Sequence, residues 1–328
     1  MNIQNKLTQE IHHLLTQKEL NQEHFPLIDQ LIQLATDEHK QGNLKKEDLP
    51  EICQAFGEEF LQETINGHAL RRPYGYAGDF LIIDKIYTFH KSENKQFRVW
   101  DEYFHQTASA KAVRNRKTYF KRLLKRKLEA GKSLKLLNIA SGPARDLFEL
   151  YQSLENKELL TTTCVEMDPH AIEYARTLNH SHLDQIEFIR KNIFKFESSD
   201  KYDLIWSAGL FDYFDDQNFL KILSKLKGLL LPGGEIVIGN FNEEHNPTRD
   251  YMEIFGNWFL HHRTDLKLYE LARTVGFLPN EIEVGEEEER VNLFLHMKER
   301  LCIKTEVKEY ATTSLACISQ GFEKALFK

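Results

Sequence analysis

Long apolar runs are missing from this sequence of 328 residues. A membrane-spanning helix needs about 20 consecutive apolar residues, so no membrane span is expected. The segment 1–18 is polar and lacks the apolar centre of a signal peptide. Cysteine is scarce, with four residues in all and no CxxC pair, so neither a structural zinc site nor another metal is expected. We therefore expect a cytoplasmic protein whose cysteines are buried thiols.

An excess of positive charge is also absent, because the formal net charge is −7. This argues against nucleic acid as a partner. Basic residues gather in one place only, with ten Lys or Arg and a single acid between Lys111 and Lys132. Apolar residues recur at helical spacing through the same segment, namely Val113, Tyr119, Phe120, Leu123, Leu124 and Leu128. The pattern favours a solvated helix face over an anion-binding face.

The first 130 residues show apolar residues at the spacing of one helix face. Two such segments lie around 7–15 and 27–35. A third, from 49 to 65, begins with Asp48 as a candidate cap and Pro50 in the first turn. Residues 1–130 are therefore predicted to form a helical region.

From Gly131 onward, short apolar runs alternate with helical patterns. Strands are predicted at 134–140, 162–167, 186–190, 202–207 and 235–240, with two more near 281–284 and 291–297. Helices are predicted at 146–154, 169–179, 219–230 and 265–277. This alternation predicts an α/β domain over 131–299, with a parallel sheet between two layers of helices. The tail, 300–328, is predicted to end in an amphipathic helix.

Small and polar residues follow the first three predicted strands, where ligands bind in such sheets. The turn after the first strand is no GxGxxG motif, because Gly142 is its only glycine and Pro143 removes a backbone donor, so a cofactor without phosphates fits it better. Glu166 at the second strand end can accept both hydroxyls of a ribose, whereas Asp168 can instead cap the next helix. Asn192 after the third strand can bind an adenine amino group or serve as a turn residue.

These segments resemble the successive motifs of class I S-adenosylmethionine-dependent methyltransferases. The motifs are LLNIASGPARDL, CVEMDPHAIEYA, IEFIRKNIF, YDLIWSAGLFDYF and LLLPGGEIVIGNF, in order over 134–241. Ala140, Ala144 and Asn138 depart from the residues that many members have. The resemblance implies S-adenosyl-L-methionine as cofactor and a Rossmann-like, seven-stranded, mostly parallel sheet whose last strand is antiparallel. The expected cofactor-binding residues are Ala140, Ser141, Gly142, Glu166, Met167, Asn192, Ile193, Ser207, Ala208 and Gly209.

Four flanking segments are similar to a bacterial subgroup, the 3-hydroxypalmitic acid methyl ester biosynthesis proteins. They are RRPYGYAGDF (71–80), SAKAVRNR (109–116), SAGLFDYF (207–214) and HNPTRDYMEIFGNWFLHHRT (245–264). The glycine-rich first segment is predicted to form a lid over the methyl donor, so that the helical region supplies much of the acceptor pocket. Arginines in these segments, Arg116 among them, are forked donors suited to a carboxylate. The expected substrate-binding residues are Tyr74, Tyr76, Asp79, Arg114, Arg249, Tyr251 and Arg263.

The reaction implied is methyl transfer to a small molecule, and the acceptor class is the open question. A carboxylate is already ionised at pH 7 and needs no base, which favours O-methylation of a fatty or hydroxy-fatty acid. An amine or amino-acid derivative would need a proton acceptor, for which Tyr76, Asp212 and Tyr213 are the candidate catalytic residues. A cofactor-binding regulatory protein without catalysis is the third hypothesis. A homodimer is compatible with the sequence.

Overall fold

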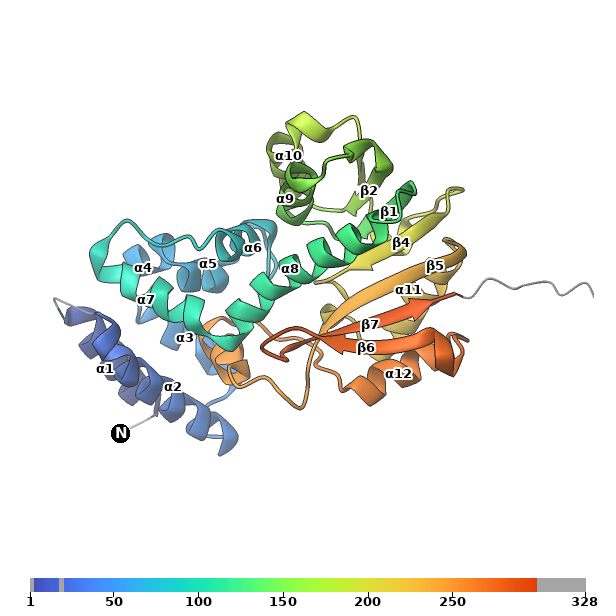
Figure 1. Ribbon diagram of the computed structural model, residues 1–328. Coiled ribbons are helices and arrows are strands. Elements are labelled where there is room, and N and C mark those ends of the chain that lie inside the picture. The colour runs from blue at the N-terminus through green and yellow to red at the C-terminus, as the bar shows by residue number, and fades with distance from the viewer. Residues whose placement is uncertain (1–2, 18–20, 300–328) are drawn as a thin grey trace, which may run out of the picture.

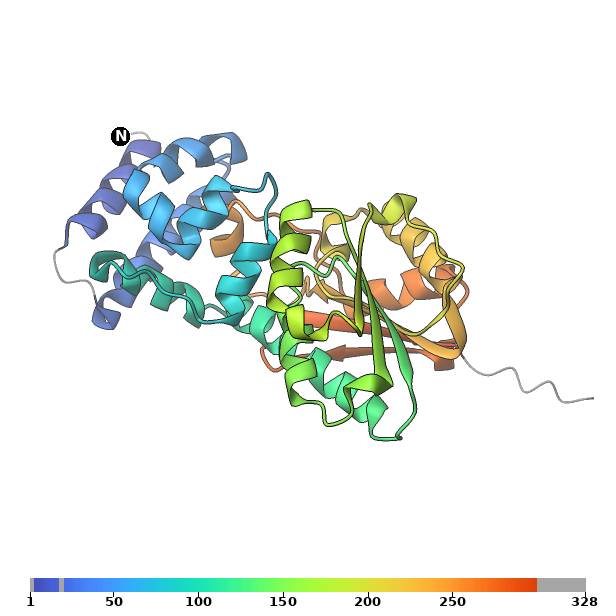
Figure 2. The ribbon, with the colours of Figure 1, turned by 90° about the horizontal axis from the view of Figure 1, so that it is seen from above.

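The computed structural model describes residues 3–17 and 21–299, and the predicted tail helix lies outside them. An N-terminal helical region stands beside a sheet domain (Figures 1 and 2). No helix within these two described ranges is long and apolar enough to cross a membrane. The same residues contain no cluster of His, Cys, Asp or Glu that could hold a metal ion.

The sheet has seven strands in the order β3-β2-β1-β4-β5-β7-β6, which confirms the predicted fold class. β7 pairs antiparallel with β5 and β6, and the other pairings are parallel. The strand order reverses between β1 and β4, so the chain leaves these two strands in opposite directions and opens a crevice. The strands are β1 Leu134–Ile139, β2 Leu160–Glu166, β3 Ile186–Arg190, β4 Tyr202–Ser207, β5 Leu230–Phe241, β6 Ile282–Glu286 and β7 Asn292–Lys298.

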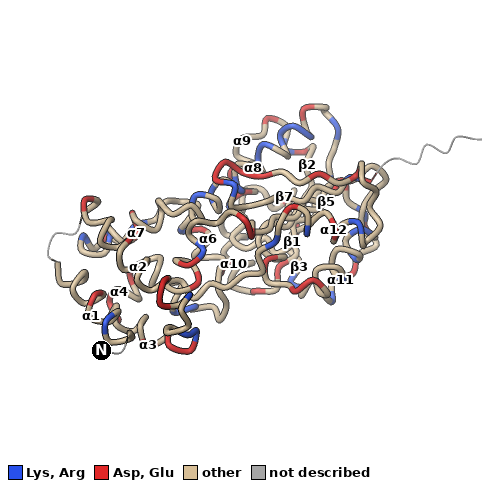
Figure 3. Tube along the Cα trace, turned by 90° about the horizontal axis from the view of Figure 1, so that it is seen from below, with Lys and Arg blue, Asp and Glu red and all other residues tan. Residues whose placement is uncertain are grey.

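Helices cover both faces of the sheet because neighbouring strand residues point to opposite faces. Leu136 of β1 packs in one core with α8, α9 and α10, whereas Leu137 packs in another with α11 and α12. The predicted helix in the basic segment is confirmed as α8, and its lysines pair with Glu149 and Glu235 of the sheet domain. Figure 3 marks the positions of Lys and Arg along the backbone in blue and those of Asp and Glu in red. The helices are α8 Ala108–Leu128, α9 Arg145–Ser153, α10 Pro169–Leu178, α11 Asp216–Lys227 and α12 Asp265–Thr274.

The helical region packs around a separate hydrophobic core, which also includes the first half of α8. The prediction of one continuous segment over 49–65 was wrong. Gly57, with φ of 81°, separates α3 from α4, and Thr64 then caps α5 by accepting the Gly67 N–H. Asp48 makes no cap hydrogen bond to α3. The helices are α1 Ile3–Thr16, α2 Phe25–Lys40, α3 Leu49–Gln54, α4 Glu58–Glu63, α5 Ile65–Arg71, α6 Phe80–Tyr87 and α7 Lys95–Gln106.

A long connection between β5 and α12, residues 242–264, leaves the sheet and returns to it; we call it the strap. Its π-helical turn Tyr251–Phe255 and Trp258 are buried in the core of the helical region. The strap therefore joins the two parts of the molecule at a point far along the chain from the helices it contacts.

Arg263 attaches the end of the strap to the sheet. Its buried guanidinium donates to the carbonyl oxygens of Phe211 and Phe214 and to Asn240 Oδ1, at 3.2, 2.5 and 2.9 Å. It also pairs with Asp216 at 3.1 Å. One cation thus satisfies three acceptors from the loop after β4 and from β5, which would otherwise be buried without a partner.

Arg263→Ala should lower the free energy of unfolding by about 3 kcal/mol, because it removes charged hydrogen bonds and leaves buried carbonyl groups unpaired. Urea denaturation measures the change. Arg249→Ala is the matched control on the same strap, since Arg249 only forms a partly exposed pair with Glu253. That control should change stability by less than about 0.5 kcal/mol. Equal effects of the two variants would contradict this role of Arg263.

Candidate active site

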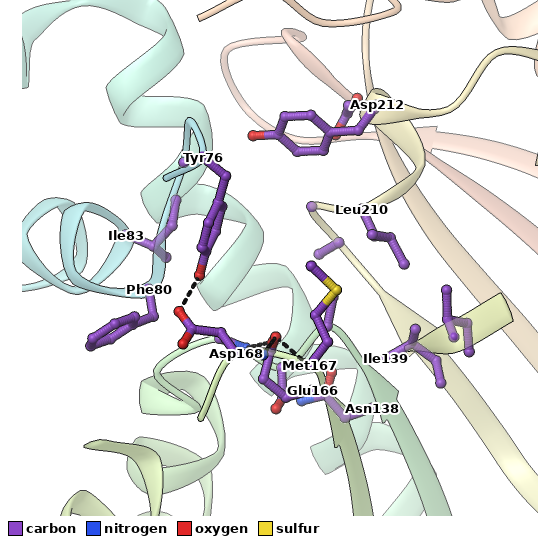
Figure 4. A pocket seen from close by; sticks show the side chains of 18 of the residues that line it. Tyr76, Phe80, Ile83, Asn138, Ile139, Glu166, Met167, Asp168, Leu210 and Asp212 are labelled. Atoms are coloured by element: carbon purple, nitrogen blue, oxygen red, sulfur yellow. Dashed lines mark hydrogen bonds between the residues drawn. The ribbon is translucent and has the colours of Figure 1, made fainter. Parts of the chain in front are cut away.

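A cavity of about 360 Å³ lies at the carboxyl ends of β1, β2, β3 and β4. The loop 72–79, which we call the lid, contributes to its wall from the helical region (Figure 4). Most of the residues expected at a site contribute to this lining. They are Tyr76, Ala140, Ser141, Gly142, Glu166, Met167, Asn192, Ile193, Ala208, Gly209, Asp212 and Tyr213.

The turn after β1 is tight and brings backbone close to the cavity. Ala140, Gly142 and Ala144 all have φ between 50° and 52°, so two of these left-handed positions carry a side chain. The buried Asn138 at the end of β1 lines the cavity, and its Nδ2 atom has no hydrogen-bond partner among the described residues. A buried donor without a partner is costly, so this position fits a ligand that supplies an acceptor.

Glu166 is fixed at the end of β2 by backbone groups. Its carboxylate accepts the N–H groups of Gly142, Met167 and Asp168 at 3.0, 2.7 and 3.0 Å. Burial raises the pKa of Glu166, and these hydrogen bonds oppose the rise. Because each carboxylate oxygen can accept more than one hydrogen bond, Glu166 can still receive hydroxyl groups from a ligand in the cavity.

Asp168 and Asn192 both make cap hydrogen bonds, and this is one of the two roles that the sequence allowed for each of them. Asp168 accepts the His170 N–H at the start of α10. Asn192 accepts the Phe194 N–H and remains exposed at the cavity edge. Asp168 has a second partner, because its other oxygen accepts the hydroxyl of Tyr76 at 2.8 Å (Figure 4).

Two tyrosines hold the lid from opposite sides. Tyr76 on the lid donates to Asp168, and Tyr213 donates to the carbonyl oxygen of Ala77 at 2.8 Å. Burial raises the pKa of both tyrosines well above the usual value. The prediction that Tyr76 or Tyr213 removes a proton from an acceptor is therefore corrected, because both hydroxyl protons are already donated and neither tyrosine ionises near neutral pH.

Asp212 is the remaining candidate for proton transfer. It lies after β4 and is 1% exposed, and one of its oxygens accepts the Phe241 N–H at 2.7 Å. Burial raises its pKa to about 7, while the nearby cations Arg116 and Arg263 act in the opposite direction. Asp212 can therefore change its protonation state near neutral pH.

Arg116 lines the cavity; it was grouped with the arginines suited to a carboxylate but was not placed among the expected substrate-binding residues. Its Nε donates to the hydroxyl of Tyr87 at 3.1 Å and its Nη1 to the carbonyl oxygen of Ala208 at 3.0 Å. No ion pair with Arg116 is found in the described part of the chain, although Asp146 and Asp212 lie near enough to influence its pKa. The sequence signal that could have identified Arg116 is its spacing, because this residue falls on the same helix face as Val113 and Phe120.

The other three arginines proposed for a carboxylate are placed elsewhere and do not line the cavity. Arg114 donates to the carbonyl oxygen of His105 and lies over the ring of Phe89. Arg249 pairs within the strap, and Arg263 is fully engaged at the sheet. The predicted substrate contacts of Arg114, Arg249 and Arg263 are corrected accordingly, since these cations already have partners.

Four further expected residues also lie outside the lining. Asp79 is buried, caps α6 and contacts His68 at 2.9 Å. Tyr251 is buried in the helical core, where it donates to Asn66, and Tyr74 packs against Phe80. Ser207 donates to the carbonyl oxygen of Ile139 inside the sheet. The structure does not bring these four side chains, for which ligand contacts were predicted, into the lining of the cavity.

Comparisons with known proteins agree with this geometry. A family model described as a methyltransferase domain matches residues 130–276. No curated protein matches the chain. Among solved structures, a possible exported protein from Bordetella parapertussis is 16% identical, with a TM-score of 0.58 over 91% of this chain and 96% of that chain.

Two methyltransferase structures are also similar to part of the chain. The magnesium protoporphyrin IX methyltransferase of Synechocystis PCC 6803 is 10% identical, with a TM-score of 0.44 over 58% of this chain and 83% of that chain. The N-methyltransferase NodS of Bradyrhizobium japonicum WM9 is 18% identical, with a TM-score of 0.40 over 57% and 96%. The family match and the class I strand order, together with the cavity at the strand ends, identify residues 130–276 as a methyltransferase domain of the Rossmann-like class I fold, with S-adenosylmethionine as its methyl donor.

Proposed function

We propose that this methyltransferase acts on a small, largely apolar acceptor, and that a carboxylate oxygen, as in a fatty or hydroxy-fatty acid, receives the methyl group. The observation that carries this proposal is that Tyr76 and Tyr213 at the cavity already donate their hydroxyl protons, while the hydroxyl of the third lining tyrosine, Tyr87, accepts a hydrogen bond from Arg116. A carboxylate acceptor needs no base, because it is ionised at neutral pH. Apolar and aromatic side chains provide much of the remaining wall, including Phe80, Ile83, Phe214, Phe241, Trp258 and Leu260.

The donors and acceptors of the cavity fit the cofactor. S-adenosylmethionine, when bound, supplies a methyl group activated by a sulfonium. Glu166 would accept its ribose hydroxyls, and Asn192 and Ile193 would contact its adenine. Arg116, a buried cation that forms no ion pair within the described residues, would hold a carboxylate, and Asn138 would donate to an acceptor atom with its free Nδ2.

The protein's contribution to the reaction is positioning in a dry site. The lid and the strap exclude water from the crevice that the sheet alone would leave open. Removing water would strengthen the electrostatic contacts of Arg116 and of Glu166, and the surrounding walls would hold the acceptor in position for the transfer.

A second acceptor class is favoured by one observation, the raised pKa of Asp212. A buried carboxylate that titrates near pH 7 can take a proton from an amine or a hydroxyl group. Transfer to the nitrogen of a small amine or amino-acid derivative is therefore the alternative. Mass spectrometry of the products formed from matched alkyl carboxylates and alkylamines separates the two classes.

Glu166→Gln should weaken binding of S-adenosylhomocysteine by about 1–3 kcal/mol, because a charged acceptor is lost. Isothermal titration calorimetry gives the dissociation constant. Glu187→Gln on β3 is a matched control, since Glu187 is exposed and does not line the cavity. An unchanged dissociation constant for Glu166→Gln would show that another residue binds the ribose.

The pH dependence of kcat/KM should distinguish the two acceptor classes. For a carboxylate acceptor we expect a nearly constant value between about pH 6 and 8, since no group on the enzyme must lose a proton. If Asp212 is the base, its ionised form is lost as the pH falls through about 7, so kcat/KM falls toward acid. Asp212→Asn should then remove this dependence together with most of the activity.

Tyr76→Phe should reduce turnover roughly tenfold while changing S-adenosylhomocysteine affinity by less than about threefold. The physical reason is that only the hydrogen bond from the lid to Asp168 is lost. Steady-state kinetics and limited proteolysis within 72–79 measure the two consequences. Tyr103→Phe removes a similar bond to Asp29 away from the cavity and should change neither. A large loss of cofactor affinity in Tyr76→Phe would mean that Tyr76 binds the cofactor itself.

A further inference from the structure

Trp258 on the strap has a position that neither the cofactor nor the transfer step explains. Its backbone N–H donates to the carbonyl oxygen of Met252 at 2.9 Å, directly after the π-helical turn. Its indole Nε1 donates to the hydroxyl of Tyr213 at 2.9 Å. The side chain is 7% exposed. The strap thus holds a large aromatic ring firmly at the edge of the catalytic cavity.

The lid and the loop after β4 fix this ring from the other sides. A Cβ atom at Gly78 would lie 2.4 Å from Cζ2 of Trp258 and 2.6 Å from the hydroxyl of Tyr213, so only glycine allows this contact. Tyr213 in turn donates to Ala77 on the lid. Three segments distant in sequence therefore meet at the indole, and the ring forms a rigid wall.

A second, smaller cavity of about 20 Å³ lies beyond this wall in the helical region. Phe241 and Trp258 line both cavities and therefore separate them. Apolar side chains dominate the smaller cavity, among them Ala69, Ile86 and Val113. It has room for little more than a methyl group as it stands.

The polar side chains around the smaller cavity are already satisfied. Asn66 donates to the carbonyl oxygen of Phe255 and accepts the hydroxyl of Tyr251. Ser109 accepts the hydroxyl of Thr248. Because these groups have partners, the space offers little to a water molecule and suits methylene groups instead.

We propose that Trp258 is a specificity-determining residue, whose indole limits how far the apolar end of the methyl acceptor extends from the catalytic cavity toward the helical region. This inference rests on the proposed function in that the acceptor has an apolar end. It does not depend on whether oxygen or nitrogen receives the methyl group.

The test measures binding of straight-chain carboxylates and straight-chain primary amines of increasing length to the full chain loaded with S-adenosylhomocysteine. In the wild type, affinity should rise about fourfold per methylene and then stop rising at the length that reaches Trp258. In Trp258→Leu the two cavities join, so the affinity should continue to rise with chain length for at least one further methylene. Calorimetry gives each dissociation constant without any need for turnover.

Two further variants test whether the shift in limiting length is specific to Trp258 and to the smaller cavity. Trp100→Leu removes an equally buried tryptophan that lines neither cavity, and it should leave the limiting length unchanged. Ala69→Leu, which fills the smaller cavity, should return the limit of Trp258→Leu toward that of the wild type. Thermal unfolding verifies that each variant is folded at the temperature of the titration.

The outcomes separate this inference from the proposed nucleophile. An unchanged limiting length in folded Trp258→Leu would overturn the inference, as would an equal shift in Trp100→Leu. Binding of the amines alone, with the expected shift, would support the role of Trp258 and reject the carboxylate. Absence of length-dependent binding in both series would reject an apolar end at this wall.

Discussion

The opening between β1 and β4 is the constraint on which the rest of the structure depends. The strand order reverses there, so the following segments diverge and leave the strand ends accessible. Methyl transfer requires those ends to be covered, because water would solvate both the nucleophile and the sulfonium. Residues of the lid and of the strap line the cavity at these ends, and the hydrogen bonds of Tyr76 and Tyr213 hold the lid to opposite sides of the crevice.

Within the part of the chain that the structure describes, the buried charge of Arg116 in the cavity is held without a close ion pair. Arg116 lies among Asp146 and Asp212, whose pKa values burial raises to about 6 and about 7. A cation held by neutral oxygen atoms keeps its attraction for an incoming carboxylate, whereas a salt bridge would consume it. The same burial raises the pKa of Asp212 to a value near neutral pH, so its carboxyl group can exchange a proton there. A carboxylate acceptor would use the charge of Arg116, whereas an amine acceptor would use the raised pKa of Asp212.

Much of the sheet domain could be predicted from sequence because its signals are local. Buried strands appear as short apolar runs, and the helices between them begin with caps such as Asp168. The single helix predicted over 49–65 failed because the conformation of Gly57 breaks it, and a spacing argument does not detect such a break. Arg116 was named beside Arg114 as suited to a carboxylate, but only Arg114 was placed among the expected substrate-binding residues. The position of Arg116 on the apolar face of α8 was nevertheless visible in the spacing.

The sequence by itself determined the α/β alternation, the cofactor class and the strand-end positions of Glu166 and Asn192, since these depend on neighbours within a few residues. Only the tertiary structure decided which arginine faces the cavity and that the hydroxyl protons of Tyr76 and Tyr213 are already donated. It also decided that Trp258 meets Gly78 across the crevice. These contacts join segments more than 90 residues apart in several cases, such as Tyr76 with Asp168 at a separation of 92. Pairing over such distances is set by the packing of whole elements, which no local pattern encodes.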